Sequence, residues 1–244
     1  MKYIPSINIE SGIHQEFQYI VTPNAKEVLG NIVESFHSGI HSFTIIGNYG
    51  TGKSSFIIGL EKDLENGTSN LVTNRNVFGN VTAFEFMNIV GDYASLSDVL
   101  SAKLDIANFA DSKNIFEALS NKYKECKKNG KFLFIVIDEF GKILEYAANN
   151  NPEKELYFLQ KLAEFVNHPS RNVILLTTLH QNFGSYAYKL NDAQRNEWLK
   201  IKGRYKEIVF VEPVEQLMFL ASEQLNGNLA TMKENAKTNF IQLY

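Results

Sequence analysis

One octapeptide constrains the fold of this chain more than any other stretch. It matches the pattern G-x-x-x-x-G-K-[ST] and consists of Gly47, Asn48, Tyr49, Gly50, Thr51, Gly52, Lys53 and Ser54. An apolar run at residues 43–46 precedes it and a helical pattern begins near Ser54, so we expect a strand, a tight loop and a helix in that order. The glycines let the backbone curl until successive N–H groups face inward at the positive end of the helix. The sequence therefore predicts a phosphate-binding loop.

Two side chains at the end of this loop have expected roles in binding a nucleotide. Lys53 would reach the β and γ phosphates, and the Ser54 hydroxyl would bind Mg²⁺. Ser55, the next residue, is included among the predicted nucleotide-binding residues. The alternative is a glycine-rich turn with an ordinary surface lysine, and the strand and helix expected on either side argue against it.

A pair of acidic residues later in the chain forms the second motif. Asp138 and Glu139 follow the apolar run at residues 132–137, which has the length of a buried strand. Ligands of parallel α/β sheets bind at the carboxyl ends of the strands, so this position favours a role in chemistry. We expect Asp138 to hold Mg²⁺ through water and Glu139 to polarise a water molecule as general base. The alternative is a solvated helix start, where both acids merely favour the helix dipole.

Composition and charge exclude several classes of protein. The formal net charge of −3 gives no basic field over the whole sequence, as non-specific nucleic-acid binders have, although a local basic patch stays open. Cys126 is the single cysteine, which rules out an internal disulfide and suits a reducing cytoplasm. No apolar run approaches about 18 residues and no apolar signal segment is present at the start, so the sequence supports neither membrane spanning nor secretion.

The order of predicted elements indicates an α/β fold. Strands are predicted at residues 42–46, 81–86, 131–139, 172–178 and 207–211. Helices are predicted at residues 23–39, 54–64, 95–106, 114–128, 140–148, 152–166 and 185–200. Strands separated by helices imply a mainly parallel sheet with helices on both faces, hence three layers. We expect an N-terminal extended segment at 1–21, a core domain at 22–212, and the start of a helical lid or linker at 213–244, truncated by the end of the chain.

The octapeptide, the strand that ends in Asp138 and Glu139, and the later strand with polar residues at its end resemble the ATPase core of the AAA+ type, within the P-loop NTPases. The resemblance covers roughly residues 20–225. It implies a five-stranded sheet in the order 5-1-4-3-2, with ATP and Mg²⁺ as ligands. It also implies assembly into a homo-oligomer.

The same resemblance implies roles for residues outside the two motifs. Thr178 is the first choice for the polar residue that senses the γ-phosphate or the attacking water, with His180 and Gln181 as second choices. Arg204 matches the place of the arginine that AAA+ subunits offer to a neighbour, with Arg195 as the alternative; a surface arginine paired with Glu207 would be the ordinary explanation. Residues 19–23 resemble the segment that packs on adenine, although core packing explains them equally well.

A narrower resemblance concerns partners. Residues 138–142, 178–181, 198–204 and 212–213 resemble large bacterial ATPases of phage-defence loci, including the BREX P-loop protein type. This implies a homo-oligomer or a larger defence complex, in the cytoplasm and without a membrane, and leaves DNA open as a partner.

Three classes of function compete. The first is an ATP-hydrolysing motor or switch, and the second is a nucleotide-gated assembly scaffold with slow or no turnover. The third, a small-molecule phosphotransferase, fits less well, because Asp138 and Glu139 suit water activation and no arginine-rich lid is present.

Overall fold

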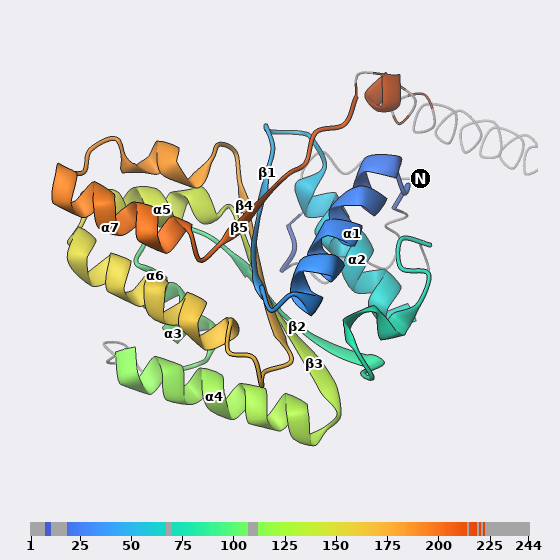
Figure 1. The fold of residues 1–244 in the computed structure, drawn as a ribbon, viewed down its shortest axis with the longest axis horizontal. Helices are drawn as coiled ribbons and strands as arrows, with labels where there is room; N and C mark the ends of the chain where they lie inside the picture. Colours follow the sequence, from blue (N-terminus) through green and yellow to red (C-terminus); the bar gives the residue numbers. More distant parts are fainter. Residues whose placement is uncertain are drawn as a thin grey trace, which may run out of the picture.

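A sheet of five parallel strands lies at the centre of the computed structural model, which describes residues 8–10, 19–66, 70–106, 112–213, 215–218, 220 and 222 (Figure 1). The strands are β1 (Ser42–Ile46), β2 (Ala83–Val90), β3 (Lys131–Asp138), β4 (Val173–Leu179) and β5 (Lys206–Val209). They pair in the order β2-β3-β4-β1-β5, every pair parallel. This is the predicted order 5-1-4-3-2 read from the opposite edge, so the fold prediction is confirmed.

Helices cover both faces of the sheet. They are α1 (Pro23–His37), α2 (Lys53–Asn66), α3 (Leu96–Lys103), α4 (Ser112–Lys128), α5 (Phe140–Asn149), α6 (Pro152–Val166) and α7 (Asp192–Lys202), with 3₁₀ turns η1 (Arg75–Phe78) and η2 (Phe183–Ala187). The first two helices pack on one face, and α3 to α7 lie on the other (Figure 1). The domain therefore has the three layers that alternating strands and helices require.

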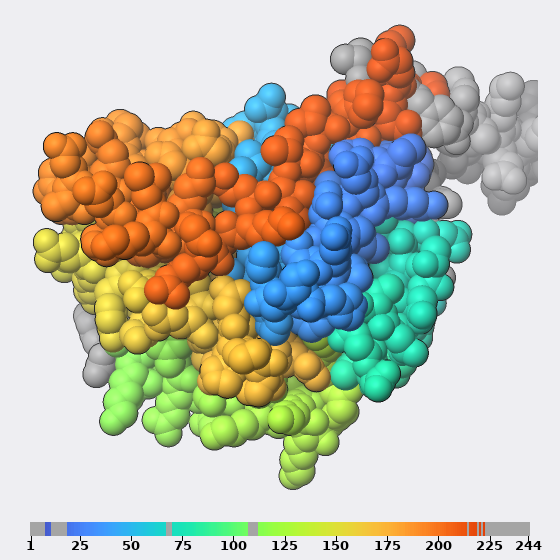
Figure 2. All heavy atoms as spheres, in the orientation of Figure 1, coloured from blue at the N-terminus to red at the C-terminus, as the bar shows by residue number. Residues whose placement is uncertain are grey.

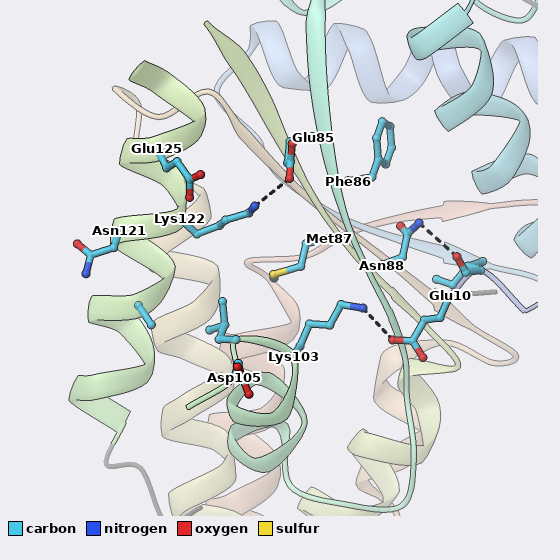
Figure 3. Close-up of a pocket in the computed structure, with 13 residues that line it drawn as sticks. Glu10, Glu85, Phe86, Met87, Asn88, Lys103, Asp105, Asn121, Lys122 and Glu125 are labelled. Atoms are coloured by element: carbon cyan, nitrogen blue, oxygen red, sulfur yellow. Dashed lines mark hydrogen bonds and ion pairs between the residues drawn. The ribbon is translucent and has the colours of Figure 1, made fainter. Parts of the chain in front are cut away.

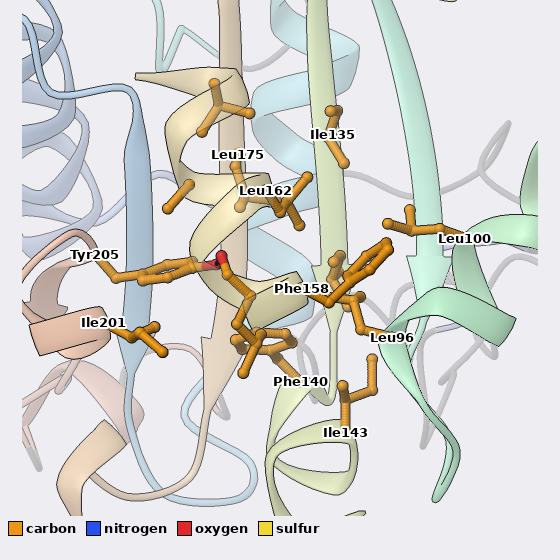
Figure 4. Packing of buried hydrophobic residues seen from close by; sticks show 14 of the residues in the cluster. Leu96, Leu100, Ile135, Phe140, Ile143, Phe158, Leu162, Leu175, Ile201 and Tyr205 are labelled. Carbon is orange, nitrogen blue, oxygen red and sulfur yellow. Dashed lines mark hydrogen bonds between the residues drawn. The ribbon is translucent and has the colours of Figure 1, made fainter. Parts of the chain in front are cut away.

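The central strand β3 shows why its sequence is apolar without interruption. Phe132, Phe134 and Val136 join the core beneath α1 and α2. The alternate residues, including Leu133 and Ile135, join the core beneath the other helices, part of which Figure 4 shows. Successive side chains of a strand point to opposite faces, and both faces are covered here, so both sets must be apolar.

Helix α1 begins where the sequence predicts it. Thr22 is its N-cap, and its hydroxyl accepts a hydrogen bond from the backbone N–H of Ala25 at 3.0 Å. Pro23 occupies the first helical position, where the missing N–H costs nothing. The helix ends at His37, and Gly39 follows in a left-handed conformation with φ +89°.

The structure corrects several predicted boundaries. The predicted helix at residues 185–200 is confirmed only from residue 192, because Asn191 has an extended backbone and forms a capping box with Gln194 that starts α7 there. The chain between α2 and β2, where no helix was predicted, contains η1, which places Phe78 in the core. Strand β2 extends to Val90 rather than to residue 86, and β5 ends at Val209 rather than at residue 211.

Some predictions fall outside the described part of the chain. The extended segment at 1–21 is described only at residues 8–10 and 19–21, and the C-terminal addition only at 213, 215–218, 220 and 222. Within the described residues, no helix is long and apolar enough to cross a membrane.

Candidate functional site

The predicted phosphate loop connects β1 to α2, and α2 begins at Lys53. Gly50 and Gly52 have φ of +77° and +94°, a region that favours glycine. Gly47 is required for a different reason, because a Cβ there would lie 2.4 Å from the carbonyl oxygen of Phe210. The chain that follows β5 thus packs directly beneath the loop, and its backbone N–H at Phe210 donates to the Ile46 carbonyl at 2.7 Å.

The amine of Lys53 lies inside this loop. Its Nζ donates to the carbonyl oxygens of Gly47 at 2.5 Å and Asn48 at 2.9 Å, and the side chain is only 5% exposed. Burial lowers the pKa of Lys53, and the charge of Asp138 acts in the opposite direction. The Lys53 ammonium group is thus held by loop carbonyl oxygens at the position predicted to bind phosphate.

The loop and the acid pair meet at one edge of the sheet. Ser54 Oγ donates to Asp138 Oδ2 at 2.7 Å, although 84 residues separate them in the chain. Thr178, from the end of β4, donates to Asp138 Oδ1 at 2.5 Å. Asp138 is only 5% exposed, and each of its carboxylate oxygens accepts a hydrogen bond from a hydroxyl of a different element, as buried polar atoms require. Three residues predicted separately therefore share one hydrogen-bonded cluster.

The backbone at Glu139 has an unusual conformation. Its φ of +53° and ψ of +34° are left-handed, which is uncommon for a residue other than glycine. The backbone N–H donates to both Asp138 Oδ1 and Thr178 Oγ1 at 3.0 Å, and the side chain forms an ion pair with Lys142. Strained conformations of this kind persist where neighbouring contacts over-determine them, and functional sites are their common location.

Gly91 supports this conformation and was missed by the sequence analysis. Its backbone N–H donates to the Asp138 carbonyl oxygen at 2.7 Å. A Cβ at this position would lie 2.6 Å from the Glu139 carbonyl oxygen. The signal that could have revealed it is a glycine directly after β2, but the predicted strand ended several residues earlier.

His180 lies against the phosphate loop. Its ring stacks on Tyr49, with centroids 3.4 Å apart and planes at 23°, and its Nδ1 is 3.4 Å from Lys53 Nζ. Burial lowers the pKa of His180, and the nearby Lys53 charge lowers it further. Tyr49 is itself 77% exposed, so this aromatic pair borders the loop on its solvent side.

The two candidate arginines form their contacts outside the cluster of Ser54, Asp138 and Thr178. The carbonyl oxygen of Arg204 accepts a hydrogen bond from Ser42 at the start of β1, whereas the loop follows the end of this strand, roughly 16 Å further on. The Arg204 guanidinium lies 3.4 Å from Glu164, so its observed partner differs from Glu207, the partner that the alternative explanation gave it. Arg195 lies on α7 and donates to the Leu190 carbonyl at 3.3 Å.

Three other predicted residues take ordinary positions. Thr51 Oγ1 donates to the Asn48 carbonyl at 2.9 Å within the loop, and Ser55 is half-buried in the first turn of α2. Tyr19 packs against Gly59 of α2, where a Cβ would come within 2.5 Å of its ring. Its packing against the core is thus observed.

A cavity of about 680 Å³ lies elsewhere, along the edge strand β2 and next to α3 and α4 (Figure 3). Glu85 in its wall pairs with Lys122 at 2.8 Å and Lys131 at 2.7 Å, and these hydrogen bonds lower the pKa of Glu85. The sequence offered no role for this carboxylate; the structure shows that it joins α4 to the sheet. Among the described residues, no group of three or more His, Cys, Asp or Glu side chains could hold a metal ion.

No protein-family model matches the chain, and no curated protein matches it. Among solved structures, it is similar to the ORC2 protein of Aeropyrum pernix in its ADP form, with a TM-score of 0.55 and 12% identity. The structure of the same protein described as ADPNP-ADP complexes has a TM-score of 0.54, also at 12% identity. Both matches cover 86% of this chain and 54% of the other, so the chain spans about half the length of that protein. The comparison supports the same three-layer α/β fold for this chain.

Proposed function

We propose that this chain binds ATP with Mg²⁺ and hydrolyses it, as an AAA+-like motor or switch module. The observation that carries the proposal is the hydrogen bond of 2.7 Å between Ser54 and Asp138, because it joins the phosphate loop to the acid pair. Similarity to a protein whose structures are described with ADP and ADPNP supports an adenine nucleotide as the ligand.

The residues present fit a magnesium nucleotide. A hydroxyl and a carboxylate are hard oxygen donors of the kind that Mg²⁺ prefers, and Ser54 and Asp138 supply them side by side. When bound, the ion would supply positive charge that offsets the negative charge of the phosphates. In the proposed cycle, Lys53 leaves the carbonyl oxygens of Gly47 and Asn48 and donates to the phosphates instead.

Glu139 is proposed as the general base. It follows the buried Asp138 directly, and the left-handed backbone fixes where its side chain starts. Thr178 accepts from the Glu139 backbone N–H and donates to Asp138, so it ties the base to the metal ligand. A residue in this position can transmit the state of the γ-phosphate to β4, which is the proposed sensor role.

Arg204 is proposed to act on the nucleotide of a neighbouring subunit, since its own loop lies at the opposite end of β1. This part of the proposal requires an oligomer. The division into a core at 22–212 and a helical lid or linker from 213 belongs to the same proposal. The narrower assignment, to an ATPase of a phage-defence complex, rests on the segment resemblance alone. The competing function is a nucleotide-gated scaffold, in which ATP binding assembles subunits and turnover is slow or absent.

The test measures ATP affinity by calorimetry and steady-state phosphate release for the wild type and three variants. Lys53→Ala is expected to lose ATP binding, whereas Glu139→Gln is expected to keep binding and lose turnover. Lys113→Ala, which changes an exposed lysine of α4, is the matched control and should behave as wild type.

The outcomes separate the two functions. Turnover that collapses in Glu139→Gln while ATP binding survives supports hydrolysis. ATP-dependent assembly without phosphate release in the wild type supports the scaffold. Wild-type protein that binds no ATP, or a Lys53→Ala variant with unchanged affinity, contradicts the nucleotide site itself.

A further inference from the structure

One buried carboxylate oxygen close to the phosphate loop has no hydrogen-bond partner. Glu212 follows β5 and is only 6% exposed. Its Oε1 accepts from Thr22 Oγ1 at 2.5 Å and from Asn24 Nδ2 at 3.3 Å, whereas its Oε2 is buried without a partner. Buried polar atoms in proteins are nearly always paired, so an acceptor left open in this way calls for a donor.

The position of Glu212 relative to the loop follows from its neighbours. Phe210, two residues earlier, lies beneath Gly47 and packs on Phe56 of α2, with ring centroids 5.4 Å apart. Two extended residues span at most about 7 Å, so Glu212 lies close to the base of the loop. Figures 1 and 2 show the chain leaving β5 and crossing the surface toward the start of α1, where Thr22 is the N-cap.

The surroundings of Glu212 are aromatic and carry hydroxyl groups. Tyr19 packs on α2, and burial together with the charge of Glu212 raises the pKa of its phenol, so the phenol stays neutral. No lysine or arginine forms an ion pair with Glu212 among the described residues. The residues that carry this cluster, 19–22 and 211–213, belong almost entirely to irregular chain, so regular secondary structure need not break when a ligand enters.

We infer that Glu212 selects the base of the bound nucleotide, its Oε2 accepting a hydrogen bond from the exocyclic amino group of adenine. The inference rests on the proposed function, because it assigns the base-reading contact of that same site. The open acceptor is Glu212 Oε2, and adenine offers it a donor in the 6-amino group.

Guanine fits the same acceptor poorly. It carries a carbonyl oxygen where adenine carries the amino group, and two acceptors facing each other repel. A carboxylate could read the N1–H and 2-amino groups of guanine together only with both oxygens free. Oε1 of Glu212 is already engaged by Thr22 and Asn24. The desolvation of Oε2 is already incurred in the fold, so a matching donor gains a hydrogen bond without stripping water from the carboxylate.

The experiment compares affinities for ATP and for inosine triphosphate, which differs at C6 by a carbonyl in place of the amino group. Wild-type protein is expected to bind ATP about ten- to a hundredfold more tightly, the range for leaving one charged hydrogen-bonding group unmatched. In Glu212→Gln the side-chain amide can donate to the carbonyl, so the ratio should fall toward one. GTP serves as a second probe with the same expected direction.

Two matched measurements keep the outcome decisive. Glu215→Gln changes an exposed carboxylate of the same segment and should leave the ratio as in wild type. Equal wild-type affinity for both triphosphates, or an unchanged ratio in Glu212→Gln, overturns the inference and leaves the phosphate site standing. Failure of wild type to bind either triphosphate overturns the inference together with the proposed function. Because the first comparison uses wild type alone, it holds even where the Glu212 variant does not fold.

Discussion

Replacing Gly91 with alanine should displace the backbone of Asp138 and Glu139, which Gly91 contacts. The added Cβ would lie 2.6 Å from the carbonyl oxygen of Glu139 and 3.0 Å from that of Asp138. Ordinary contact begins at 3.4 Å, so the shorter approach is about 0.8 Å too close. Both obstructing atoms are backbone, which a rotamer change cannot move. The chain at the end of β2 or at the start of α5 must therefore shift.

The size of the effect follows from that shift. Overpacking of this kind costs about 1–3 kcal/mol. For a chain of this length, each kcal/mol lowers the melting temperature by about 2–4 °C, so Gly91→Ala should melt about 2–12 °C below wild type. A displacement approaching 1 Å at Glu139, the proposed general base, should also slow phosphate release about ten- to a hundredfold. ATP affinity should change little, because the phosphate loop is not displaced.

Thermal unfolding with a matched glycine variant tests this reasoning. Gly30 lies on the exposed face of α1, and a Cβ there meets nothing within 4 Å. Gly30→Ala should therefore stabilise the protein by about 0.5–1 kcal/mol, since alanine favours the helix interior. Equal melting temperatures for the two alanine variants would refute the argument that Gly91 is fixed by the carbonyl oxygens behind it.

Two further predictions concern the borders of the site. The pKa of His180 is lower in the folded protein than its ordinary value of about 6.5. As the pH is lowered below that value, the unfolded chain binds protons that the folded protein resists, so the free energy of unfolding decreases. His180→Gln should remove this component; urea unfolding from pH 7.5 to about 5.5 should show wild type losing more stability than the variant, and a constant difference would contradict it. Arg204→Ala should lower turnover without lowering ATP affinity. Adding Glu139→Gln subunits should restore activity, because the interface between the two variants can combine the intact Glu139 of one subunit with the intact Arg204 of the other. Turnover unaffected by Arg204→Ala would remove this arginine from the mechanism.

The sheet and the two motifs could be predicted because local pattern and fold agree there. The run at residues 132–137 is apolar on both faces, which only a covered central strand tolerates, and the structure confirms β3. The pairing order came from family resemblance, since periodicity does not encode which strands are neighbours. Thr22 and Pro23 mark a helix start by chemistry local to a few residues, which is why that boundary was accurate.

The remaining features depend on contacts between distant parts of the chain. Gly91 matters because β2 ends beside Asp138, and a sequence shows no such register. Glu212 is separated by 190 residues from the threonine whose hydroxyl it accepts from, so no local pattern points to its open oxygen. The predicted helix at residues 185–200 began too early because apolar spacing continued across Asn191, where side-chain capping outweighs periodicity.

A structure with a non-hydrolysable ATP analogue and Mn²⁺ in place of Mg²⁺ tests the central claim most directly, since the anomalous signal locates the ion. We expect one Mn²⁺ peak between Ser54 Oγ and the carboxylate of Asp138, with Lys53 turned from the Gly47 carbonyl oxygen to the phosphates. An ion bound away from these two side chains, or triphosphate density away from the loop at residues 47–54, would contradict the account.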